Sequence, residues 1–167
     1  MTDLVVPLLA GTVAAATPLI YAALGELVTE KSGVLNLGIE GMMLMGAIAA
    51  FAGATTSGSL ALGVVCGALA GAATAALFAV LTLSLLANQV ATGLALTIFG
   101  AGLSALVGQG YVSLTLRGLQ PLAIPGLSRI PLLGPVLFTQ NALVYLSLLA
   151  CAGIHWFLYR TKAGLVL

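Results

Sequence analysis

A long run without charged residues is the feature that most constrains how this chain folds. From Gly41 to Leu116 there is no Asp, Glu, Lys or Arg in 76 consecutive residues. A helix needs about 20 apolar residues to cross the hydrocarbon core of a bilayer, so this run alone is long enough for three crossings. Of all 167 residues, 61% are hydrophobic and 5% are charged, whereas soluble domains carry about 25% charged residues. The sequence therefore predicts an integral membrane protein.

Two backbone architectures satisfy their hydrogen bonds inside lipid, the helix and the closed β-barrel. A barrel strand alternates apolar and polar residues over about ten positions, and this sequence lacks that alternation. We therefore predict an all-α, polytopic helical membrane protein with about five transmembrane helices in a single transmembrane domain, residues 1–167. The expected spans are approximately residues 4–24, 35–54, 60–86, 90–107 and 139–159.

Residues 108–138 differ in composition from the predicted spans, because they are rich in proline. Proline interrupts helices because it lacks the backbone N–H and clashes with the preceding turn. We therefore expect an irregular loop, partly seated in the membrane, on one face of the bilayer. This segment holds four of the six prolines and two arginines: Pro121, Pro125, Pro131, Pro135, Arg117 and Arg129.

The residue types that carry catalysis or bind metals are nearly absent. His155 is the only histidine and has no Ser, Cys or carboxylate beside it, and Cys66 and Cys151 lie in apolar runs as packing residues would. The sequence has no Gly-x4-Gly-Lys-Ser/Thr loop to hold ATP phosphates and no metal-ligand spacing. We therefore expect no enzymatic activity, catalytic residue, metal or cofactor. The lack of a basic cluster predicts no nucleic-acid partner.

Small residues recur at every fourth position of the third expected span. Gly63, Gly67 and Gly71 are followed by Ala75 and Ala79. On a helix this spacing forms one smooth stripe, which lets a neighbouring backbone approach closely in the membrane. We interpret the stripe as a helix-packing surface rather than a ligand site.

The sequence EKSGVLNLGIEGMM, residues 30–43, places Glu40 among glycines at the start of the second expected span. A charged side chain inside the bilayer costs at least about 2.5–3.5 kcal/mol and normally faces the bundle interior or a water-filled path. Asn36 and Glu40 are therefore candidates to line a translocation pathway. The structural alternative is that Asn36 caps the second span and that Glu40 pairs with a helix end.

Three stretches carry a resemblance to a known family. ALGELVTEKSGVLNLGIEGMMLMGA, residues 23–47, closely resembles the signature of ABC-type importer permeases for branched-chain amino acids, ribose-like sugars and nucleosides, and is most similar to the nucleoside and "simple sugar" branch. NQVATGLALTIFGAGLSALVG, residues 88–108, is similar to a second recurring motif, in which Gln89 stands where an acid is usual. YRTKAGLVL, residues 159–167, resembles the start of a third block that in this family leads to the region contacting the ATPase.

The resemblance covers essentially the whole chain but only about the first half of such a permease, whose halves form an internal repeat. It therefore implies an N-terminal half, from a truncated permease or an incomplete gene product. The implied function is that of a transmembrane permease subunit of an ATP-binding-cassette importer for nucleosides or related sugars. Transport would proceed by alternating access, driven by a separate ATPase, in the bacterial plasma (inner) membrane.

The resemblance also implies partners and an orientation. The partners are an ABC ATPase subunit, a second permease subunit (identical or homologous), an extracytoplasmic solute-binding protein and the lipid bilayer. If the chain from Tyr159 onward is cytoplasmic, five crossings place residues 108–138 outside and residues 26–32 on the cytoplasmic side. The charged residues that would then face the ATPase are Glu26, Glu30, Lys31, Arg160 and Lys162.

Asn88 and Gln89 leave two interpretations open. Their amides can hydrogen-bond to substrate hydroxyls in a translocation pathway, or they can mark the boundary between two spans. For the chain as a whole, the alternatives are an ATPase-independent secondary transporter or channel, for which Glu40 is the one candidate ion-coupling acid, and a non-transporting membrane fragment.

We predict that Gly67→Leu disrupts folding, because a branched side chain in the stripe would keep the neighbouring helix at a distance. Membrane yield and thermal melting in detergent measure this effect. An unchanged yield and melting temperature would contradict the assignment of the stripe.

Overall fold

The computed structural model describes residues 2–116, 118–123 and 133–167. These residues contain five helices long and apolar enough to cross a membrane, which confirms the predicted polytopic helical fold. The helices are α1 (Thr2–Lys31), α2 (Ile39–Ser57), α3 (Leu60–Ala79), α4 (Gln89–Gly108) and α6 (Ala142–Arg160). The short elements are a π-helical turn η1 (Val80–Ser84), a 3-10 turn η2 (Gln109–Tyr111), α5 (Leu133–Leu137), α7 (Lys162–Val166), and strands β1 (Pro121–Ala123) and β2 (Thr139–Asn141), which pair antiparallel.

The expected irregular segment, residues 108–138, is only partly described. Its described residues contain η2, β1 and α5. Arg117, Pro125, Arg129 and Pro131 lie outside the described residues. The chain divides into two compact units, residues 1–28 with 118–167 and residues 29–117.

Helix α1 continues through Lys31, beyond the expected span of residues 4–24. Glu26, Glu30 and Lys31 therefore lie within its last turns. The helix ends where Gly33 adopts a left-handed conformation, with φ of 80°. The N–H of Gly33 donates to the carbonyl of Glu30 (3.0 Å), and the N–H of Val34 donates to the carbonyl of Thr29 (3.0 Å). This is the Schellman pattern, which satisfies carbonyls that a helix end otherwise leaves open.

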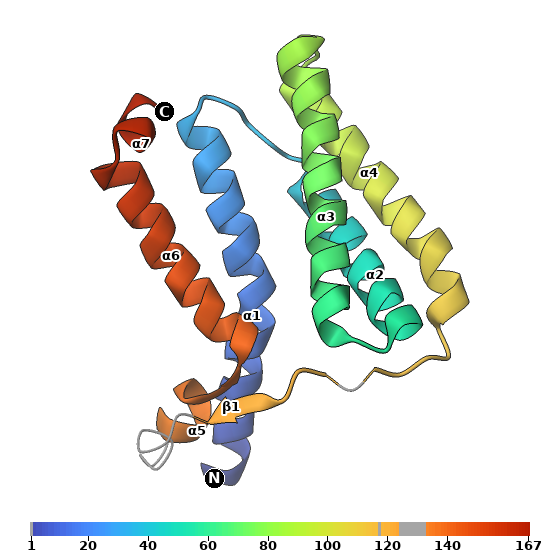
Figure 1. Cartoon of the computed structure of the whole chain (residues 1–167), viewed down its shortest axis with the longest axis vertical. Coiled ribbons are helices and arrows are strands. Elements are labelled where there is room, and N and C mark those ends of the chain that lie inside the picture. Colours follow the sequence, from blue (N-terminus) through green and yellow to red (C-terminus); the bar gives the residue numbers. More distant parts are fainter. Residues whose placement is uncertain (1, 117, 124–132) are drawn as a thin grey trace. The chain divides into compact units, whose positions relative to one another are not determined.

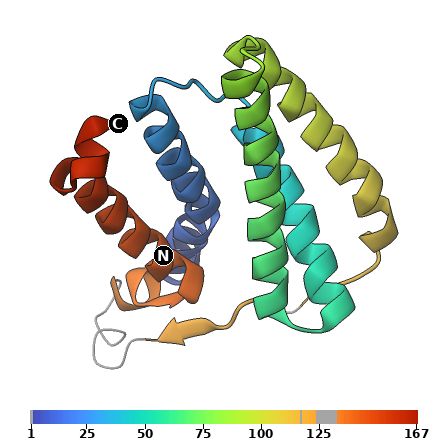
Figure 2. The ribbon, with the colours of Figure 1, turned by 45° about the horizontal axis from the view of Figure 1, so that its top comes forward.

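Helix α2 lies between α3 and α4 in the unit of residues 29–117 (Figure 2). It forms a tight hairpin with α3, and Gly58 supplies the left-handed residue (φ 68°) between them. A Cβ added at Gly63 would lie 2.7 Å from the carbonyl oxygen of Ala50, and one at Gly67 would lie 2.9 Å from that of Gly46. Both glycines therefore sit directly on the α2 backbone. At Gly71, no described atom lies within 4 Å of the corresponding position.

The other unit is held by hydrogen bonds to main-chain carbonyls. The side-chain amide Nε2 of Gln140, in β2, donates to the carbonyl oxygens of Ala10 (3.1 Å) and Val136 (2.7 Å), and Gln140 is buried. The hydroxyl of Tyr21 in α1 donates to the carbonyl of Leu143 in α6 at 2.8 Å. These bonds fasten the β1–β2 ribbon and the start of α6 to α1, and Figure 1 shows β1 and α5 beside the N-terminal half of α1.

The connection between α3 and α4 combines two uncommon backbone features. The last residues of α3 widen into the π-helical turn η1, a feature often found at functional sites. Leu86 then takes a positive φ of 53°, and it is the one non-glycine residue to do so among the described residues. For an L-residue other than glycine, this conformation costs roughly 1–2 kcal/mol. The α3–α4 turn is therefore a strained point of the fold.

We predict that Leu86→Gly stabilises the protein by up to about 1 kcal/mol, because glycine adopts a positive φ without strain. The side chain of Leu86 is 83% exposed within the chain, so its removal opens no cavity. The measurement is the free energy of unfolding in detergent micelles.

The matched control is Leu85→Gly. Leu85 is also exposed but has φ of −94°, so glycine there adds only backbone freedom and should destabilise by about 0.5–1 kcal/mol. Equal shifts in the two variants would contradict the strain at Leu86.

Candidate functional site

The α1–α2 connection (residues 32–38) is non-helical and is held mainly through its backbone. The N–H of Leu35 donates to the side-chain oxygen Oε1 of Gln89 at 2.8 Å. The carbonyl of Leu37 accepts a hydrogen bond from the hydroxyl of Thr97 at 2.9 Å. The N–H of Gly38 donates to Oδ1 of Asn36, a buried side chain, at 2.9 Å.

Glycines let the α1–α2 connection and the start of α2 lie directly on α4. A Cβ at Gly93 would lie 2.9 Å from the backbone nitrogens of Leu37 and Gly38. A Cβ at Gly100 would lie 2.5 Å from the carbonyl oxygen of Gly41, and a Cβ at Gly41 would collide with the backbone of Leu96. Helix and connection therefore meet backbone to backbone, with no room for even a methyl group.

A small apolar cluster lies at the junction of the three helices. Met42 of α2, Phe78 of α3 and Leu96 of α4 are all buried, and Val34 of the α1–α2 connection packs against them. The Nδ2 group of Asn36 lies 3.6 Å from the sulfur of Met42. The connection is thus fixed on one side by apolar contact and on the other by hydrogen bonds to α4.

These contacts place Glu40 deep along α4. Thr97 and Gly100 are 8 and 11 residues beyond Gln89, the first residue of this 20-residue helix. At 1.5 Å per residue they lie about 12 and 16 Å along a helix of about 30 Å. Gly41, which contacts both levels, therefore lies near the middle of α4, and Glu40 precedes it. Figure 1 shows α2 beginning partway along α3 and α4 rather than at their ends.

The second expected span, residues 35–54, thus begins as helix only at Ile39, so that Glu40 lies in the first turn of α2 rather than in its interior. The Glu40 side chain is exposed within the chain, and none of the described residues forms a hydrogen bond with it. The arrangement leaves a carboxylate accessible at about the middle depth of a membrane-spanning helix.

The structure places Asn36 in the α1–α2 connection with Gln89 against it, whereas Glu40 follows in the first turn of α2, near the middle of α4. Gln89 contacts the α1–α2 connection directly, whereas Asn88 precedes α4 as its N-cap, accepting a hydrogen bond from the N–H of Ala91 at 3.0 Å. Asn36 does not occupy the N-cap position of α2, which is Gly38. Instead, its side chain holds the backbone two residues further on.

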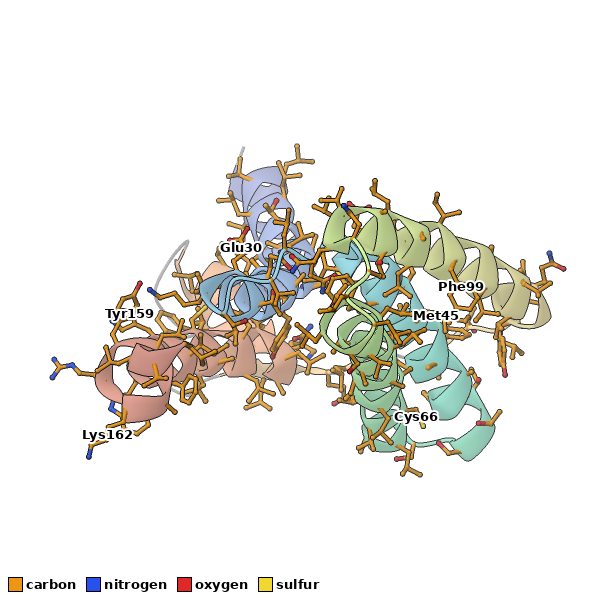
Figure 3. All side chains as sticks on the ribbon, turned by 90° about the horizontal axis from the view of Figure 1, so that it is seen from above. Glu30, Met45, Cys66, Phe99, Tyr159 and Lys162 are labelled. Atoms are coloured by element: carbon orange, nitrogen blue, oxygen red, sulfur yellow. The ribbon has the colours of Figure 1, made fainter. Side chains whose placement is uncertain are left out.

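The charged residues expected to face an ATPase lie in both units. Glu26 belongs to the unit of residues 1–28 and 118–167, as do Arg160 and Lys162, whereas Glu30 and Lys31 belong to the other. Arg160 ends α6 and Lys162 begins α7, and both are exposed. Figure 3 shows Lys162 projecting away from the helices of its unit.

Sequence reasoning missed Thr97, Gly93 and Gly100. The available signal is their spacing, because Gln89, Gly93, Thr97 and Gly100 are separated by four, four and three residues. Residues at this spacing lie on one face of a helix. Apart from Leu96, this face is built from small and polar residues, which marks it as the side that contacts another backbone.

Comparison with known proteins identifies the family. The model of the branched-chain amino acid transport system/permease component family matches residues 8–167. The chain belongs to this family. No solved structure matches the chain.

Three curated relatives are similar to this family member over most of its length. The putative glucose ABC transporter permease protein TsgC13 of Haloferax volcanii is 44% identical over 95% of this chain and 49% of its own length. The nucleoside ABC transporter permease protein NupC of Lactococcus lactis subsp. cremoris is 31% identical over 89% of this chain and 50% of its own length. The guanosine ABC transporter permease protein NupQ of Bacillus subtilis is 30% identical over 92% of this chain and 52% of its own length. The chain thus spans about half the length of these relatives.

We predict that Gly100→Ala destabilises the permease by about 1–3 kcal/mol, because a methyl group there overlaps the backbone of Gly41. Melting temperature and membrane yield measure the effect.

Gly102→Ala, two residues along the same helix, is the control, because no described atom lies within 4 Å of its Cβ position. It should be neutral or slightly stabilising, since alanine favours the helix. Equal losses in both variants would show that the Gly100–Gly41 contact is not what holds α2 on α4.

Proposed function

We propose that this chain forms the N-terminal half of the membrane-spanning subunit of an ABC importer, and that the α1–α2 connection and the first turn of α2 line its translocation pathway. The family membership supports the transporter class. The observation that carries the site is the depth of Glu40, whose carboxylate lies near the middle of α4 beside a break between two helices.

Transporters commonly bind their solutes at such breaks. Where a helix is interrupted near the bilayer midplane, free backbone groups and half-helix ends can contact polar ligands. Gln89 holds the backbone of Leu35 at this break, while Asn36 and Glu40 bring an amide and a carboxylate group to it. These are groups that can exchange hydrogen bonds with the hydroxyls of a passing sugar ring.

The names of the relatives support a solute class. The names of the three relatives refer to glucose, a nucleoside and guanosine, and each nucleoside contains a sugar ring. We propose that the solute is a nucleoside or a related sugar, taken from an extracytoplasmic binding protein. A site that binds the solute weakly, through hydrogen bonds to its hydroxyls, suits this transfer, because the solute must also dissociate from the permease.

Energy would come from a separate ATPase at the cytoplasmic membrane surface. The charged residues proposed to face it are Glu26, Glu30, Lys31, Arg160 and Lys162. Near the end of α6, the aromatic side chains of Trp156 and Tyr159 are exposed. Aromatic and cationic side chains in this order are typical of a membrane–water interface. A second permease subunit, identical or homologous, would complete the pathway in the plasma membrane.

We predict that Glu40→Gln preserves membrane insertion but lowers the uptake rate of nucleoside or sugar about ten-fold. The reason is that the carboxylate can no longer accept a charge-assisted hydrogen bond from a hydroxyl of the solute. The measurement is uptake of radiolabelled guanosine and glucose in proteoliposomes holding the complete permease, its binding protein and its ATPase. Asp3→Asn is the control, because it neutralises another acid at the start of α1, the opposite end of that helix from residues 32–38.

The ATPase arm of the experiment separates the alternatives. Replacing the ATP-binding lysine of the ATPase should abolish uptake. Uptake that persists without any ATPase would instead identify a secondary transporter in which Glu40 couples an ion. Wild-type uptake by Glu40→Gln would remove Glu40 from the proposed pathway.

A further inference from the structure

Helix α4 holds the α1–α2 connection at two points, and both are main-chain groups of the connection. Gln89 accepts from the N–H of Leu35, and Thr97 donates to the carbonyl of Leu37. The two side chains lie eight residues apart on the same face of α4, with Gly93 between them in contact with Leu37 and Gly38. The connection therefore lies along α4 over about two helical turns.

The main-chain groups of the connection need such partners. Outside a helix, the N–H of Leu35 and the carbonyl of Leu37 have no regular intrahelical acceptor or donor. In a membrane, an unsatisfied backbone group costs several kcal/mol unless protein or water satisfies it. Gln89 and Thr97 fill this need at the two residues that flank Asn36.

We propose that Gln89 and Thr97 are positioning residues, which hold residues 35–41 on α4 so that this segment and α4 move as one body during transport. Only the expected effect on transport rests on the proposed function. Both side chains act through the backbone of the connection rather than on the solute. The single donor proton of Thr97 is already directed at Leu37, and the oxygen of Gln89 is directed at Leu35.

The chemistry of the two contacts defines which replacements preserve them. A backbone N–H can only donate, so position 89 requires an acceptor oxygen, which glutamine and glutamate both provide. The carbonyl of Leu37 requires a donor, which threonine and serine both provide but valine does not. Gln89→Glu and Thr97→Ser should therefore keep the segment in place, whereas Gln89→Leu and Thr97→Val should release it.

The first experiment is hydrogen–deuterium exchange of the complete permease in lipid nanodiscs. Gln89→Leu and Thr97→Val are each expected to accelerate exchange in peptides covering residues 34–38 by roughly three- to ten-fold, the effect of losing one membrane hydrogen bond. Exchange in the middle of α3 should not change. Thr56→Val is the matched control, because the Thr56 hydroxyl bonds only within its own helix, to Ala52 at 2.8 Å and Gly53 at 3.4 Å.

The second experiment is ATP-driven uptake by the same variants. Gln89→Leu and Thr97→Val should slow uptake of guanosine and glucose by the same factor, because a displaced segment impairs passage of either solute. Gln89→Glu and Thr97→Ser should restore both the slow exchange and the uptake. A residue that contacted the solute would instead change the two rates unequally.

The outcomes separate this proposal from the proposed function. Unchanged exchange at residues 34–38 in both Gln89→Leu and Thr97→Val would overturn the positioning role. Faster exchange with wild-type uptake, or unequal losses for the two solutes, would also overturn it. If the wild-type permease transported neither solute, the proposed function would fail, while the exchange measurements would still decide whether α4 holds the segment.

Discussion

The whole site depends on one constraint, which is that backbone groups inside a membrane need partners from the protein itself. The chain leaves α1 after Lys31 and enters α2 at Ile39, so residues 32–38 carry their peptide groups without a helix. Gln89 and Thr97 supply the missing acceptor and donor. Because those partners lie in the first half of α4, they also determine how deep α2 begins. The depth of Glu40 is thus a consequence of where α4 offers polar side chains.

Small residues make this arrangement possible on both sides of α2. In lipid, helices associate through close packing and hydrogen bonds, since lipid tails are as apolar as the side chains. Gly41 meets α4 at Gly100, and Gly46 lies close to Gly67 of α3. Backbone contact on two faces leaves α2 little freedom to rotate or slide without collision. Any movement of this unit in transport is therefore simplest as a movement of α2, α3 and α4 together.

Composition and length made the fold predictable, but they did not determine where the helices begin. An uncharged run of 76 residues requires several crossings, and the glycines around Glu40 indicated a special start to the second one. Hydropathy cannot place a helix end, however, because Glu26 and Glu30 continue α1 as readily as apolar residues would. The partnership of Thr97 with Leu37 joins residues 60 positions apart. No local pattern reveals such a pair, although the spacing from Gln89 to Gly100 marks the face of α4 that carries it.

The helix break and the acid also depend on each other. Glu40 is in the first turn of α2, where the positive end of the helix dipole stabilises a carboxylate by about 0.3–1 kcal/mol, and up to about 2 in partly buried sites. An acid at the centre of a spanning helix costs at least about 2.5–3.5 kcal/mol. One turn further along α2, Glu40 would lose most of the dipole contribution. Even at its present position the dipole offsets only part of the cost, so the carboxylate needs water or a polar partner. The proposed pathway beside the break would supply that remainder by bringing water to the carboxylate.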